Sequence, residues 1–191
     1  MPTGTYTVVA TPASPSPAVT RAEAKRQLRE LADDAEIDRL ITAAVGFVER
    51  DLALSLTPRT VRASFERFPC VDDPDGLVLS WRYGPVSSLT SIEYRPAGDA
   101  WVTLDPADYE VDLASEPPRV APLDSWPHVP RGLDRVRLTF EAGFTVVPEE
   151  LKQALLLLVE HWHIEPESAG QLPAAVKPLL ANWRYYHAPV A

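Results

Sequence analysis

The sequence contains little cysteine and little glycine, and each shortage excludes a class of protein. Cys70 is the only cysteine, so the chain can form neither an internal disulfide nor a zinc site built from several cysteines. With 8 glycines, it also lacks the glycine-rich motifs by which nucleotide-binding folds hold phosphate. We therefore expect folding in a reducing compartment, and we predict no cofactor and no bound metal.

A concentrated basic charge is missing as well. The chain has 18 Lys and Arg against 27 Asp and Glu, which gives a formal net charge of -9. Its basic residues are spread along the sequence, which argues against tight, non-specific binding of DNA phosphates. An acidic wall would still suit a passage through which DNA slides, because it repels phosphates. Charge alone therefore leaves open both a protein without DNA contact and a DNA conduit.

Long hydrophobic runs are absent too. The longest, Ala154–Val159, is far shorter than the roughly 20 residues that a membrane-spanning helix needs. The first residues lack a basic region followed by an apolar stretch. We expect a soluble protein with no membrane partner and no secretion signal. With 191 residues and 46% hydrophobic content, the chain can build one domain or two small modules.

Four segments follow one another along the chain. Residues 1–19 are rich in Thr, Pro, Ser and Ala, which predicts a flexible arm that is ordered only where something holds it. Residues 20–58 predict two helices. The motif Thr20–Glu23 has the form of a capping box and predicts a short helix to about Leu31.

The second predicted helix needs a partner. Asp33 or Asp34 can cap it, and apolar residues recur along it from Ile37 to Leu52 at spacings of three and four, which places them on one face. A lone helix has nothing against which to bury such a face. A partner helix must therefore come from elsewhere in the chain.

Residues 59–147 change to a period of two, with turn residues between short apolar runs. This pattern, without intervening helices, predicts an antiparallel β module. Its strands are predicted at 61–68, 77–81, 89–94, 101–104, 109–113 and 135–140.

Residues 148–191 return to helical periodicity and predict C-terminal helices and a tail. The first helix is expected from Pro148 to about Ile164, with Leu151, Leu155, Leu158 and Trp162 as the stripe that pairs with the second helix. A last helix is predicted between Pro173 and His187, with a start nearer Val176 because Pro178 would break a helix begun at Pro173.

Two groups of residues resemble metal ligands only partly. The run Asp72–Gly76 resembles a calcium loop but lacks its later bidentate Glu, so we interpret it as a hairpin turn. His161 and His163 are two apart, and on a helix residues two apart face away from each other. We therefore predict no chelating pair.

A nucleophile and a base lie close together in Asp124-Ser125-Trp126-Pro127-His128. Catalysis requires Ser, His and a carboxylate to meet in space, and no Gly-x-Ser-x-Gly motif presents Ser125. We interpret Ser125 and His128 as loop residues and predict that the protein is not an enzyme.

The run Trp183-Arg184-Tyr185-Tyr186 is a candidate partner-binding site. Aromatic residues and Arg are enriched where protein interfaces concentrate their binding energy. Alternatively, Trp183 and Tyr186 simply attach the last helix to the core. We expect Arg184 and Tyr185 to face a partner more than Trp183 does.

Several stretches together resemble the head-tail connector, or adaptor, proteins of tailed phages, which also occur in prophages and gene transfer agents. The resemblance covers most of the chain from about Val8. It rests on these segments, in this order: Thr20–Arg29, Ile37–Glu49, Tyr83–Tyr94, Asp108–Val111, Ser125–Pro127, Ala142–Phe144, Val147–Ala154, Leu157–Trp162, Leu172-Pro173 and Leu179–Arg184. The long N-terminal arm and the acidic Glu165-Pro166-Glu167 depart from the family pattern and affect surface details.

The resemblance implies an α+β fold, in which a small helical bundle of N- and C-terminal helices carries an inserted antiparallel β module. It implies a ring of identical subunits, a dodecamer in the particle, whose subunits can be monomers when free. The ring binds the portal protein through the C-terminal residues and offers a docking surface to tail-proximal neck proteins, either a stopper or a tail terminator. DNA passes through the ring without specific binding.

We therefore expect a structural protein of the virion neck, made and assembled in the cytoplasm of a bacterial host. One alternative is another neck or tail-completion protein, which would form a ring without affinity for the portal. A second alternative is a small-molecule or peptide-binding domain, with a pocket lined by residues such as Trp81, Trp101 and Trp126.

Overall fold

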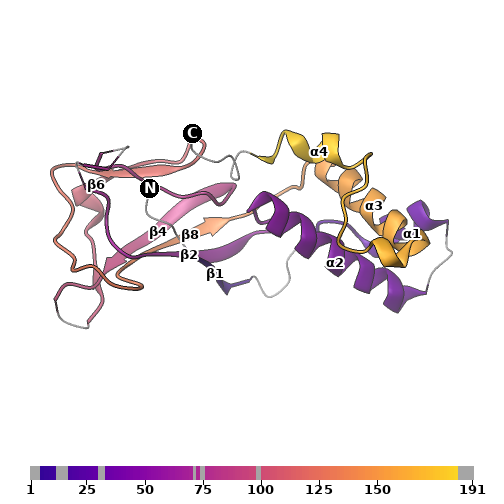
Figure 1. The fold of residues 1–191 in the computed structure, drawn as a ribbon, viewed down its shortest axis with the longest axis horizontal. Helices are drawn as coiled ribbons and strands as arrows, with labels where there is room; N and C mark the ends of the chain where they lie inside the picture. Colours follow the sequence, from indigo (N-terminus) through magenta and orange to yellow (C-terminus); the bar gives the residue numbers. More distant parts are fainter. Residues whose placement is uncertain are drawn as a thin grey trace. The chain divides into compact units, whose positions relative to one another are not determined.

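The computed structural model describes residues 5–11, 17–29, 33–70, 72–73, 76–97 and 100–184. It divides into two compact units, drawn in Figure 1. The β unit comprises Met1–Ala13 and Pro58–Gly143, and the helical unit comprises Ser14–Thr57 and Phe144–Ala191. The protein is thus of mixed α and β composition, as the sequence predicts.

The first helix of the helical unit, α1 (Arg21–Leu28), begins with the predicted capping box. The Glu23 N–H donates to Oγ1 of Thr20 at 3.2 Å, and the Thr20 N–H donates to Oε2 of Glu23 at 2.7 Å. These two bonds satisfy backbone donors that the start of a helix leaves free. The helix ends before Arg29, which has a left-handed backbone conformation (φ 54°), and the predicted end at Leu31 lies outside the described residues.

The two long helices, α2 (Asp34–Leu52) and α3 (Glu149–Ile164), pack together. Asp33 caps α2 by accepting a hydrogen bond from the Glu36 N–H at 2.8 Å. Both predicted stripes are buried in one core, which α1 completes, so the predicted pairing is confirmed. The fully buried side chains of this core include Ile37, Ala44, Val48, Leu52, Leu151, Leu155 and Leu158.

The last described helix, α4 (Lys177–Ala181), is short. It begins after Val176, as predicted from the position of Pro178, and Val176 and Leu180 are buried in the helical core. The predicted continuation to His187 lies mostly outside the described residues. Within the described ranges, no helix is long and apolar enough to cross a membrane.

The β unit contains two antiparallel sheets. In the larger, the strand order is β1-β2-β8-β4-β5, and in the smaller it is β3-β7-β6. The strands are β1 (Thr5–Ala10), β2 (Arg59–Phe65), β3 (Leu79–Ser80), β4 (Val86–Tyr94), β5 (Val102–Thr103), β6 (Tyr109–Asp112), β7 (Arg119–Pro122) and β8 (Val136–Ala142). Short 3-10 turns lie at Pro106–Asp108 in the β unit and at Pro166–Ser168 in the helical unit.

Buried and more exposed residues alternate along the central strands, and the buried ones form the core of the β unit. Every second residue of β2 and β8 is buried, including Val61, Phe65, Leu138 and Phe140. Leu79 and Val120 of the smaller sheet and Trp81, which directly follows β3, belong to the same cluster. The two sheets therefore share one hydrophobic core, as expected when period-two strands bury one face each.

Two strands were not predicted. β1 pairs with β2 from Thr5 to Ala10, so these residues of the predicted arm form a strand that β2 holds in place. Their Thr, Tyr and Val side chains favour a strand, and β2 supplies the backbone partner. β7 lies in a proline-rich stretch that sequence patterns assign to a loop, yet it pairs with both β3 and β6.

Gly143 ends the β unit where the chain passes into the helical unit. Its φ is 122°, a conformation that side chains disfavour, and its N–H donates to the Pro85 carbonyl at 2.9 Å. Glycine thus permits the turn that closes β8 against the start of β4.

Replacing Leu155 with Ala should lower the free energy of unfolding by about 2–5 kcal/mol, because it removes a side chain that is only 1% exposed in the helical core. Ile164→Ala is the matched control, since Ile164 lies on the same helix and is 67% exposed. Urea denaturation of both variants measures the difference. Equal stabilities would mean that α3 buries a different face.

Candidate functional site

Trp183 connects the end of the described chain to the helical unit. Its ring meets Phe144 edge to face, with ring centroids 5.5 Å apart. Its indole N–H donates to Oε2 of Glu150, on the first turn of α3, at 3.3 Å. Trp183 therefore makes the docking contacts that the sequence left as an alternative to partner binding.

Arg184 is exposed but has a partner within the helical unit. Its Nη2 lies 2.9 Å from Oδ2 of Asp51 near the end of α2. An exposed ion pair of this kind contributes little to stability and exchanges readily for another partner. Tyr185 and Tyr186, the other two members of the predicted cluster, lie outside the described residues, so partner binding by all four stays a prediction.

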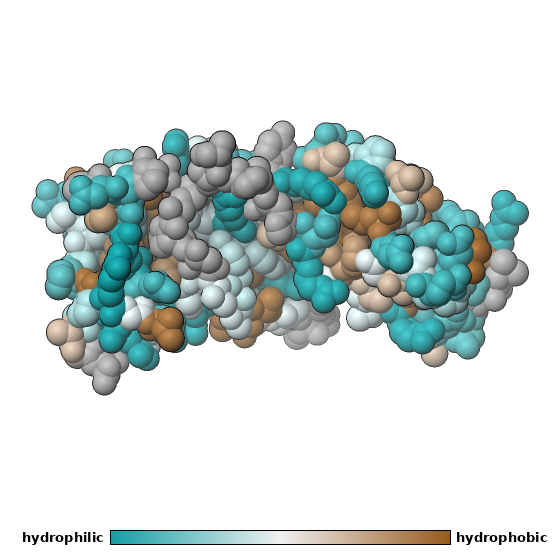
Figure 2. Space-filling view, viewed as in Figure 1, coloured by the Kyte–Doolittle hydropathy of each residue, from teal (hydrophilic) through white to brown (hydrophobic). Residues whose placement is uncertain are grey.

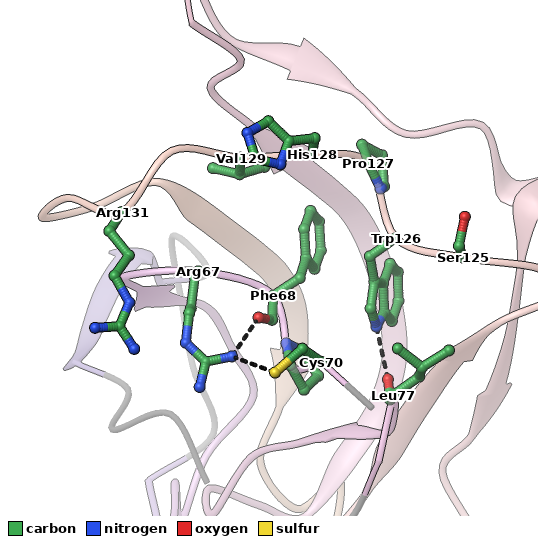
Figure 3. Close-up of a pocket in the computed structure, with 11 residues that line it drawn as sticks. Arg67, Phe68, Cys70, Leu77, Ser125, Trp126, Pro127, His128, Val129 and Arg131 are labelled. Carbon is green, nitrogen blue, oxygen red and sulfur yellow. Dashed lines mark hydrogen bonds between the residues drawn. The ribbon is translucent and has the colours of Figure 1, made fainter. Parts of the chain in front are cut away.

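The β unit contains a hollow of about 470 Å³, shown in Figure 3. One wall is a stacked pair, in which the rings of Phe68 and Trp126 are parallel within 4° at a centroid separation of 4.5 Å. The Trp126 N–H donates to the Leu77 carbonyl at 2.6 Å, which fixes the indole in place. His128 and Arg131 border the same hollow.

The three tryptophans predicted to line a pocket do not meet at this hollow. Trp126 lines the hollow, but Trp81 and Trp101 do not. Trp81 is buried in the core against Phe140. Trp101 lies beneath two guanidinium groups, with Cζ of Arg137 3.8 Å and Cζ of Arg95 4.4 Å from its ring centroid. The prediction of one ligand-binding site lined by all three tryptophans is therefore wrong.

Arg67 and Asp73 hold the turn between Cys70 and Asp73, next to the hollow. Both Nη atoms of Arg67 donate to the Asp73 carboxylate at 2.7 Å, and the Cys70 N–H donates to the same carboxylate at 2.8 Å. The hydrogen bonds from Arg67 hold the pKa of Asp73 well below its usual range, and the pKa of Arg67 is raised in return. Because this guanidinium is already paired, we assign it a structural role.

Ser125 and His128 do not form a catalytic pair. Both line the hollow, but their side chains point in different directions in Figure 3, and no hydrogen bond joins them in the described structure. A serine nucleophile requires the imidazole within hydrogen-bonding distance. The interpretation of these residues as loop positions thus agrees with the geometry.

The histidines of α3 also point apart, as predicted. Nδ1 of His163 lies 2.9 Å from Oε1 of Glu36 on α2, whereas Nε2 of His161 lies 3.9 Å from Oε2 of Glu165. Among the described residues, no group of three or more His, Cys, Asp and Glu side chains could hold a metal ion. At Asp72–Gly76, the described part forms a turn in which the Gly76 N–H donates to the Asp73 carbonyl at 2.8 Å.

Comparison with known proteins finds neighbours among solved structures. No protein-family model and no curated protein sequence matches the chain. A chain in the neck of an empty gene transfer agent particle, computed with C6 symmetry, matches with a TM-score of 0.74 and 25% identity over 98% of this chain and 97% of that chain.

Two further structures give the same result. A chain in the virion of a native gene transfer agent particle matches with a TM-score of 0.73 and 23% identity, covering 97% of each chain. One in the neck of a native particle, computed with C12 symmetry, matches at 0.65 and 22% identity over 96% of this chain and 97% of that chain. These neighbours confirm the resemblance to the head-tail connector family.

Replacing Asp73 with Asn should lower the free energy of unfolding by about 1 kcal/mol at pH 7, because the Arg67 guanidinium loses its carboxylate. A carboxyl whose pKa is lowered by folding stabilises the protein above the ordinary aspartate pKa of about 3.9, and this contribution is lost as the pH falls. The difference between the variant and the wild type should therefore shrink below that pH.

Urea denaturation between pH 7 and pH 3 measures this effect, with the exposed neighbour Asp72→Asn as the control. A difference that stays constant with pH would show that the ion pair does not stabilise the fold.

Proposed function

We propose that this chain is a structural subunit of a virion neck, a head-tail connector that joins the head of a phage-like particle to its tail. The observation that carries this proposal is the similarity over 98% of this chain and 97% of a chain in the neck of a gene transfer agent particle. Such coverage includes both units and their order along the chain. A shared fold alone does not give a function, but the residues that resemble the connector family lie in both units as well.

The arrangement of the chain supports a connector fold. In the proposal, the N- and C-terminal helices form the bundle, and the β unit is an insertion between α2 and α3. Both helical segments contribute to a single hydrophobic core, so the bundle is complete only when the chain returns after residue 143. Hydrophobic surface remains visible over α3 and α4 in Figure 2, and it is available for contact with a neighbouring subunit or the portal.

The functional form in this proposal is a ring, with twelve subunits. The C6 and C12 symmetries used for the neighbouring neck structures support this form. Ring closure requires a heterologous interface, in which each subunit presents two different surfaces. Individual contacts can then be weak, because closure makes them act together. The free protein is a monomer until the portal brings subunits together.

Portal binding is assigned to the C-terminal residues. Trp183 and Arg184 are held by Glu150 and Asp51, so they fix the point at which the chain leaves the helical unit. In the proposal, Trp183 positions the chain, while Arg184, Tyr185 and Tyr186 contact the portal. Arg184 can exchange Asp51 for an acidic group of the portal at little cost, because its ion pair is exposed.

The opposite side of the ring would receive a stopper or tail terminator, and DNA would pass through the centre. A net charge of -9 suits such a passage because it weakens contact with phosphates. The subunit would be made in the cytoplasm of the bacterial host and would remain in the virion neck. Another neck or tail-completion protein is the alternative, and it predicts a ring without portal affinity.

A chain truncated after Arg184 should remain folded but lose binding to portal-containing heads. The truncation keeps the contacts of Trp183 and Arg184 and removes the two tyrosines. Cosedimentation of purified subunit with heads from the same particle measures binding, and circular dichroism checks the fold.

The control is a chain that lacks only Val190 and Ala191, which should bind like the full chain. Undiminished binding of the longer truncation would remove the C-terminal cluster from the portal interface. Failure of the full chain to bind any portal-containing head would contradict the connector proposal itself.

A further inference from the structure

In the part of the chain that the structure describes, the larger sheet of the β unit has two open edges. At one edge lies β1, whose partner among these residues is β2. Five of its six residues are exposed, including Val8 at 43% and Val9 at 47%. Within the described residues, no backbone hydrogen bond joins the outer side of β1 to another segment. This strand therefore presents a free row of N–H and C=O groups.

The second open edge is the first part of β4. β5 covers only Glu93 and Tyr94, and the Leu104 N–H donates to the Ile92 carbonyl at 2.8 Å. Residues 86–91 pair with β8 on their inner side and, among the described residues, with no strand on the outer side. Ser87, Ser88 and Thr90 are exposed there.

Neither open edge carries a charge. β1 reads Thr-Tyr-Thr-Val-Val-Ala, and residues 86–91 read Val-Ser-Ser-Leu-Thr-Ser. By contrast, the interior strands β2 and β8 hold Arg59, Arg62, Arg137 and Glu141. Natural proteins usually protect free edges with charges, proline or bulges, because an unprotected edge pairs with other strands. Charges here lie on the strands that need no protection. The edges carry only bulges, which leave short stretches of β1 and β4 free to pair.

We propose that β1 of one subunit pairs with residues 86–91 of β4 in a second copy of this chain, so that neighbouring sheets become continuous around the ring. This inference rests on the proposed function, because it names the subunit contact of the connector. Two different edges on one subunit give the head-to-tail contact that a closed ring requires. The two edges also have the same length, six residues each.

The dimensions fit a ring around DNA. Four strands, β1, β2, β8 and β4, separate one contact from the next, and at a spacing of about 4.8 Å they span roughly 19 Å of the circumference. Twelve copies, by the C12 symmetry of a neighbouring neck structure, give a circumference of roughly 230 Å and a diameter of about 73 Å. A DNA duplex is narrower than a circle of strands of this diameter.

Bulges limit the length of the contact. β4 shifts register against β8 between Val86 and Ser88 and between Leu89 and Ser91, and β1 shifts against β2 between Val8 and Ala10. A bulge bends and twists its strand, so the hydrogen-bonded ladder between β1 of one subunit and β4 of the next is short. Short ladders suit a ring whose stability comes from closure rather than from any single contact.

Disulfide cross-linking tests this pairing. In a Cys70→Ser background, Thr7→Cys in β1 is combined with Ser88→Cys or with Thr90→Cys in β4, and the subunits are assembled into particles. Within one subunit, β1 and β4 are three strand spacings apart, about 14 Å, whereas a disulfide needs Cα atoms within about 7 Å. Any disulfide between the two strands is therefore intermolecular.

After oxidation, non-reducing electrophoresis of purified particles should show a ladder of multimers beyond the dimer for at least one of the two pairs. The matched control joins Thr7→Cys to Val111→Cys, which places the second cysteine on an exposed strand of the other sheet and should give no ladder. If subunits enter particles but neither β4 pair forms multimers, or if the control does so equally, the edge pairing is wrong and the neck function stands.

If the wild-type chain itself never enters particles, the neck function fails and this inference fails with it. Should only the cysteine variants fail to enter, hydrogen exchange of the wild-type chain decides the matter. Amides of residues 5–10 and 86–91 should then exchange roughly tenfold more slowly in particles than in the free subunit. Unchanged exchange in both strands would overturn the pairing.

Discussion

The packing of α2 against α3 is the contact on which the rest of the structure depends. Each helix has one apolar face and neither can bury it alone, so the helical unit forms only when residues 34–52 and 149–164 meet. The β unit lies between these segments in the sequence and has its own core. Because the β unit folds compactly, it brings the ends of the two helices back together, and the entropy cost of closing the long connection is reduced.

This arrangement separates the tasks that a ring subunit must perform. The helical unit carries the C-terminal residues, which Trp183 and Arg184 attach to α3 and α2. The β unit carries two uncharged strand edges on one sheet. In the proposed connector, portal docking therefore belongs to the helical unit and contact between subunits to the β unit. A change in either surface can then occur without disturbing the core of the other.

Much of this fold could be predicted from the sequence, because strong periodicity depends on local residues. The helical stripes, the capping box of Thr20 and Glu23, and the strands β2, β4 and β8 all follow from spacing and turn chemistry. β1 was missed because its partner, β2, is remote in the sequence and its neighbours are prolines. β7 was missed because the prolines around Arg119–Pro122 indicate a loop.

The candidate sites were less predictable. The sequence does not distinguish the environments of the three tryptophans. In the structure, Trp81 lies in the core, Trp101 stacks under Arg137, and of the three Trp126 alone lines the hollow. Spatial convergence depends on tertiary contacts, which period and composition do not encode. The open edges of the sheet could not be predicted from the sequence for the same reason, since an edge is defined by which strands pair and not by its residues alone.

A cryo-electron microscopy reconstruction of the neck of assembled particles containing this chain would test the account most directly. The account predicts a ring of identical subunits directly beneath the portal, into which both the helical unit and the β unit fit, with the C-terminal residues against the portal. A neck without density for this chain, or a chain that remains a monomer in the presence of its portal, would contradict the proposed role.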